Sequence, residues 1–69
     1  MTLNEIILDA EWINEKTHVI IKYKDNRGVV HTMAEGAWFC DQVLNWGRCR
    51  VVELSMDFDA GEAVFYIIM

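Results

Sequence analysis

Proline is absent from this 69-residue sequence, and cysteine occurs only twice. A small secreted protein held together by disulfides needs more cysteines than this. No linker-like composition, low-complexity run or repeat divides the chain. At this length folding removes only about 60% of the unfolded chain's surface from water, so the core is small. We therefore expect one domain over residues 1–69, with Cys40 and Cys49 reduced.

The N-terminal part also lacks the features of an export or membrane signal. It has no basic segment, and its longest apolar run, Ile6 to Leu8, is far too short for a signal peptide or a spanning helix. The sequence therefore predicts a cytoplasmic protein that does not bind a membrane.

Basic residues are scarce: six Lys and Arg stand against 11 Asp and Glu, which gives a formal net charge of -5. No base occurs among residues 1–15 or after Arg50. Such a chain repels nucleic-acid phosphates and favours a protein partner with a basic surface. The alternative interpretation is that the acidic stretches are solvated faces without a partner. Direct binding of nucleic acid is not expected.

No arrangement of residues typical of catalysis is present. Ser55 is the only serine and has no histidine placed near it, and the four glycines are scattered rather than grouped in a phosphate loop. The two cysteines are nine positions apart, which is not the spacing of a zinc site. The carboxylates of "DFDAGE" suit calcium, but the segment lacks the other ligands of a calcium loop. We therefore expect a protein that is not an enzyme and has no cofactor or metal ligands.

What the sequence does contain is apolar residues, which make up 54% of the chain. This share is above the usual value for a soluble domain. Either both faces of a sheet are covered, or part of the apolar surface is meant for another copy or another protein.

Alternation of apolar and polar residues predicts an α+β fold with five strands and one helix, in the order βββαββ. The expected strands cover residues 5–14, 18–24, 29–34, 50–56 and 63–69. The turn "DNRG" suits a three-residue hairpin loop closed by Gly28, which places Tyr23 opposite His31 and Ile21 opposite Met33. The loop of the last hairpin has either two residues, Ala60 and Gly61, or three. An all-antiparallel solution gives a five-stranded antiparallel sheet with spatial order 4-5-1-2-3 and one helix packed on one face.

The helix is expected from about Glu35 to Gly47. Thr32 and Glu35 have the spacing of a capping box, and Gly47 suits the left-handed residue that follows many helices. A helix here gathers an apolar core face: Gly36, Ala37, Phe39, Cys40, Val43, Leu44 and Trp46. Trp38 falls outside this face, among polar residues. It either covers the edge of the sheet or anchors a partner.

These features favour a small acidic binding protein that occupies a basic or nucleic-acid-binding surface of a partner, either sterically or as a nucleic-acid mimic. The predicted partner-binding residues are Glu35, Trp38, Asp41 and Gln42 on the helix and Asp57, Asp59 and Glu62 in the last hairpin. In size, charge and lack of active-site chemistry, the chain is similar to the small accessory and inhibitor proteins of phages and mobile elements, such as anti-CRISPR proteins. The alternative is a structural or assembly module that forms a homodimer or larger oligomer. There the apolar last strand, with Val64, Tyr66 and Ile68, is buried by a second copy.

Overall fold

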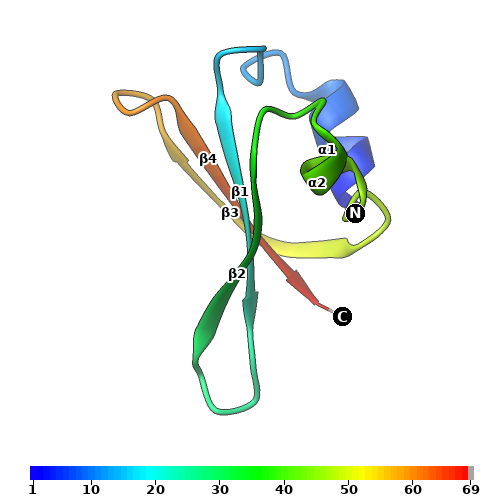
Figure 1. Cartoon of the computed structure of the whole chain (residues 1–69), viewed down its shortest axis with the longest axis vertical. Coiled ribbons are helices and arrows are strands. Elements are labelled where there is room, and N and C mark those ends of the chain that lie inside the picture. Colours follow the sequence, from blue (N-terminus) through cyan, green and yellow to red (C-terminus); the bar gives the residue numbers. More distant parts are fainter. Residues whose placement is uncertain (69) are drawn as a thin grey trace.

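The computed structural model describes residues 1–68, and these residues form an α+β fold with one sheet (Figure 1). The elements are α1 (Leu3–Asp9), β1 (His18–Lys24), β2 (Val30–Gly36), α2 (Asp41–Leu44), β3 (Arg50–Asp57) and β4 (Glu62–Ile68). Over the described residues the sheet has four strands in the order β2-β1-β4-β3. The outer pairs are antiparallel, and the central pair, β1 and β4, is parallel.

The prediction of five antiparallel strands in the order 4-5-1-2-3 is wrong. Residues 5–14 form most of α1 and a loop in place of the first strand. Without that strand, the last strand pairs directly with β1, and this pairing is parallel. The expected strand 18–24 agrees with β1 at both ends, and the other three expected strands are present with shifted ends. Met69, the expected last residue of the fifth strand, lies outside the described residues.

A capping box at the N-terminus explains why the first segment is helical. The Glu5 backbone N–H donates to the Thr2 hydroxyl at 3.4 Å, and the Thr2 N–H donates to the Glu5 carboxylate at 3.2 Å. These bonds favour the start of a helix here. The negative charge of Glu5 also interacts favourably with the positive, N-terminal end of the helix dipole. The pKa of the Glu5 carboxyl is lowered, first by the Thr2 hydroxyl and then by the Thr2 backbone.

The apolar residues of α1 also repeat at helical spacing, which competes with the alternation seen in the sequence. Leu3 is fully buried, and Ile6, Ile7 and Ala10 pack against the same core. These positions are separated by three, four and seven residues, so they lie on one side of a helix. Leu8, which does not belong to this side, is 82% exposed.

The β1–β2 hairpin has the predicted turn. The Gly28 N–H donates to the Asp25 carbonyl at 3.0 Å, and Gly28 has a φ of 81°, which glycine adopts readily. Tyr23 pairs with His31 as expected, and their rings stack with centroids 6.3 Å apart. Ile21 pairs with Ala34 instead of Met33, because Met33 is the extra residue of a β-bulge.

The β3–β4 hairpin has neither of the two expected loops. Asp57 pairs with Glu62, so four residues, Phe58 to Gly61, connect the strands. β3 contains a second β-bulge. Val51 pairs with Ile67 and Glu53 pairs with Tyr66, so Val52 has no partner on β4. The bulge bends the start of β3, which is an edge strand.

The predicted helix from Glu35 to Gly47 is wrong over most of its length. Residues up to Gly36 pair with β1 as part of β2, so Thr32 lies in a strand and caps no helix. The chain then turns, and α2 covers only four residues. Phe39 and Leu44, expected in the core, are 52% and 45% exposed.

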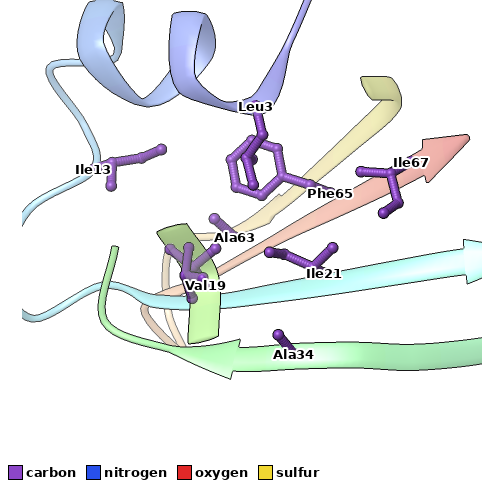
Figure 2. Packing of buried hydrophobic residues seen from close by; sticks show 9 residues of the cluster. Leu3, Ile13, Val19, Ile21, Ala34, Ala63, Phe65 and Ile67 are labelled. Atoms are coloured by element: carbon purple, nitrogen blue, oxygen red, sulfur yellow. The ribbon is translucent and has the colours of Figure 1, made fainter. Parts of the chain in front are cut away.

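The core lies between the helices and one face of the sheet (Figure 2). Leu3 of α1 lies over Phe65 of β4. The buried apolar residues are Leu3, Ile13, Val19, Ile21, Ala34, Val43, Ala63, Phe65 and Ile67. Because Leu3 and Val43 belong to one cluster with residues of a single sheet face, both helices cover that same face.

Gly47 allows the start of α1 to pack closely on the loop before β3. It is buried, and a Cβ at this position would overlap the side-chain amide of Asn4. The Asn4 N–H donates to the Gly47 carbonyl at 2.9 Å. Gly47 is not among the glycines with positive φ, so its predicted role as a left-handed helix terminator is wrong. It serves close packing instead.

Candidate interaction surface: the open face of the sheet

The face of the sheet opposite the helices is covered by no helix among the described residues. Side chains alternate between the faces of a strand, and register partners share a face. Since Val19, Ile21, Ala63, Phe65 and Ile67 point to the helices, their neighbours point the other way. We call this side the open face. Its residues are His18, Ile20, Lys22 and Lys24 of β1, Val30, Thr32 and Glu35 of β2, Arg50, Glu53, Ser55 and Asp57 of β3, and Glu62, Val64, Tyr66 and Ile68 of β4.

Apolar side chains occupy the centre of the open face. Ile20 pairs with Val64, and Tyr66 follows Val64 on the same side of β4. All three are half-buried by their neighbours in the sheet, and Ile68 is 45% exposed. β4 is therefore apolar on both faces, and Ile20 adds one apolar side chain from β1 to the face that the helices do not cover. We call Ile20, Val64, Tyr66 and Ile68 the apolar centre.

Carboxylates gather at one end of the open face. β1 and β4 begin at this end, and β2 and β3 finish there (Figure 1). Glu62 pairs with Asp57 on one side and with His18 on the other. The His18 Nε2 atom lies 3.9 Å from a Glu35 carboxylate oxygen. We call Glu35, Asp57 and Glu62 the acidic end.

Basic side chains gather at the opposite end. Lys22 and Lys24 lie toward the end of β1, and Arg50 begins β3 and pairs with Ile68. One carboxylate, Glu53, lies in this half, opposite Tyr66. We call Lys22, Lys24 and Arg50 the basic end. Within residues 1–68 both ion pairs involve histidines, and no lysine or arginine is paired with a carboxylate.

The structure brings together some of the predicted partner-binding residues and separates others. Glu35, Asp57 and Glu62 come from three strands and share the acidic end. Asp59 is exposed in the β3–β4 turn that follows. Asp41 and Gln42 are exposed on α2, on the helix side of the sheet, so they do not share a surface with Glu35.

Trp38 lies in the turn between β2 and α2. It is half-buried and packs against the core, and its ring meets the ring of Phe39 edge-on with centroids 5.5 Å apart. Phe39 is the more exposed ring of this pair. The position of Trp38 is explained by packing, and a role in partner binding stays a prediction.

Val64, Tyr66 and Ile68, the residues predicted for self-association, all lie on the open face. The predicted fold did not place these three residues beside Ile20, His18 and the basic end, because it had the segment 5–14 between the last strand and β1. The signal that could have found them is the alternation in "HVIIKYK", which puts His18, Ile20, Lys22 and Lys24 on one side of β1.

The described part of the chain forms no enclosed pocket and brings no three metal-ligating side chains together. Among the same residues, the helices are too short and too polar to cross a bilayer. No protein-family model, curated protein or solved structure matches this chain. The open face is therefore interpreted from its own residues.

Proposed function

We propose that this protein is a small, non-enzymatic binding protein whose interaction surface is the open face of the sheet. The observation that carries the proposal is the apolar centre, which lies on the uncovered side of the two central strands. Apolar patches bordered by charges are typical of protein interfaces. The tyrosine at its centre belongs to the residue types that most often dominate binding energy.

The acidic end supports a partner with a basic surface. Glu35 and Asp57 are exposed and Glu62 is half-buried, so their carboxylates are accessible for charge-assisted hydrogen bonds with lysine or arginine. A protein of accessory or inhibitor type would act in this way by covering a basic or nucleic-acid-binding surface of its target. A cytoplasmic location stays part of this proposal.

An affinity pull-down from the native host tests the proposal. The wild type should retain a specific protein, and the variant Tyr66→Ala should lose it. The variant Glu11→Lys, which changes an exposed residue outside the sheet, is the control and should retain it. A partner held equally well by the Tyr66→Ala protein would show that the open face is not the binding surface.

The alternative, an assembly module built from copies of this chain, has one specific observation in its favour. The two ends of the open face carry opposite charge, so the face is complementary to itself.

A further inference from the structure

We infer that a second copy of this chain occupies the open face, with the strands of the two sheets antiparallel and the acidic end of each copy over the basic end of the other. The inference rests on the proposed function, because it takes the open face as the binding surface and names its occupant. Three features of the chain support a second copy: the arrangement of charges, the area of the face, and the state of the β3 edge.

Charge selects one of two symmetric arrangements. Two identical faces that pack on each other are related by a two-fold axis in the plane between them. If the axis runs along the strands, the acidic end of one copy meets the acidic end of the other. If it runs across the strands, each acidic end meets a basic end. The first arrangement brings the acidic ends of both copies, with six carboxylates in all, to the same end of the interface, which disfavours it.

The second arrangement provides partners that the single chain lacks. In each copy the acidic end, Glu35, Asp57 and Glu62, lies over Lys24 and Arg50 of the other copy. Within the described residues these bases have no carboxylate partner, and of the three carboxylates only Glu35 has an ion partner, His18 at 3.9 Å. β4 lies over β4 of the second copy, which places Val64 over Tyr66 on either side of the axis. Val64 and Tyr66 of the two copies are thereby buried against each other, and Ile20 lies over the aliphatic stem of Lys22 of the second copy.

The size of the face agrees with a weak but specific dimer. Four strands about 4.8 Å apart and seven residues at about 3.3 Å each give a face of roughly 19 by 23 Å. Because side chains project from the sheet, their accessible surface is larger than this flat area. Two copies therefore bury roughly 1,000 Å² in total, at the lower limit for a specific interface. We therefore expect dissociation in the micromolar range.

The β3 edge of the sheet is less suited to a second copy than the open face. The outer edge of β3 begins under the N-terminus: Thr2 bridges to Arg50, and the Val51 N–H donates to the Met1 carbonyl at 2.9 Å. The bulge at Val52 follows directly. A covered and bulged edge is a poor template for adding strands. The open face has no such obstruction among residues 1–68.

Charge reversal tests the arrangement by sedimentation velocity at about 10 to 100 µM, where a dimer of this size should form. The wild type should dimerise. The variants Glu62→Arg and Arg50→Glu should each weaken self-association at least about tenfold, because each puts like charges across the interface. The double variant, and an equimolar mixture of the two single variants, should recover it. Glu11→Arg, with the same charge change away from the open face, should dimerise like the wild type.

Several outcomes would overturn the inference. A wild type that remains monomeric, single variants that dimerise normally, or a double variant and a mixture that fail to recover would each do so. Circular dichroism shows whether each variant is folded, and recovery in the mixture requires that both are. A monomeric wild type that still retains a host protein through Tyr66 would leave the proposed function standing. A wild type that dimerises but retains no host protein would keep the open face as the binding surface and leave the second copy as its occupant.

Discussion

Short polar side chains fix the turns of this protein through hydrogen bonds to the backbone. The Asp25 carboxylate accepts from the N–H groups of Arg27 at 2.9 Å and Val29 at 3.0 Å. Asn14 accepts from Lys16 at 2.8 Å in the loop before β1. Asp and Asn favour turns for this reason. The "DNRG" turn could therefore be predicted from the sequence, because the residues that set its geometry are adjacent in the chain.

Asp25 should make folding stability depend on pH. The hydrogen bond from His31 Nε2, at 2.9 Å, and those from the Val29 and Arg27 backbone hold the pKa of the Asp25 carboxyl below its usual range. A lowered folded pKa adds stability above the unfolded value, about 3.9, and this stability is lost as pH falls through the folded value. We expect Asp25→Asn to lower the melting temperature at about pH 5, with the difference shrinking toward about pH 2.

The control for this prediction removes the main cause of the shift. In a His31→Ala background, the effect of Asp25→Asn on the melting temperature at about pH 5 should be smaller. A difference between wild type and Asp25→Asn that stays constant over the acidic range would contradict the account.

Trp38 should contribute to stability because its ring packs on the core. We expect Trp38→Ala to lower the free energy of unfolding by about 2 kcal/mol, less than for a fully buried aromatic residue. In a domain of this size the melting temperature should fall by about 10 °C. Phe58→Ala, at an aromatic residue that is 74% exposed, is the control and should have little effect. Equal effects from the two variants would refute the packing role of Trp38.

At the scale of elements, two apolar patterns compete in the same residues. The segment 5–14 alternates like a strand, but from Leu3 to Ala10 its apolar residues also repeat at helical spacing, and the capping box decides for the helix. The segment after Thr32 has helix signals, but its backbone groups pair with β1 up to Gly36. Local sequence could not resolve either case, because the outcome depends on which strands are available as neighbours.

Substitutions of Thr2 and Thr32 test which of the two segments forms a capped helix. Both have a glutamate three residues later, yet only Thr2 caps a helix. We expect Thr2→Ala to lower the free energy of unfolding by about 1 kcal/mol, as loss of a helix cap does. Thr32→Ala, at an exposed position in β2, should lower the free energy of unfolding by clearly less. Chemical denaturation of the two variants measures both values. The opposite ranking would mean that the helix begins at Thr32 after all.

At the scale of the whole molecule, a small chain rich in apolar residues covers only one side of its sheet. The sequence shows the excess of apolar residues and predicted an apolar last strand. It did not predict that β1 is the neighbour of that strand, because the parallel pairing joins residues more than forty positions apart. The open face, with its opposite charges at either end, exists only once those strands lie side by side.

The contact between Val64 and Tyr66 of different copies distinguishes this dimer from a monomer and from the other symmetric arrangement. A sample that mixes labelled and unlabelled chains allows an NMR experiment to detect only contacts between copies. The account predicts intermolecular NOEs from the Val64 methyl groups to the Tyr66 ring. NOEs from Val64 to Ile20 of the other copy, without those to Tyr66, would indicate the axis along the strands, and no intermolecular NOE at the open face would contradict the account.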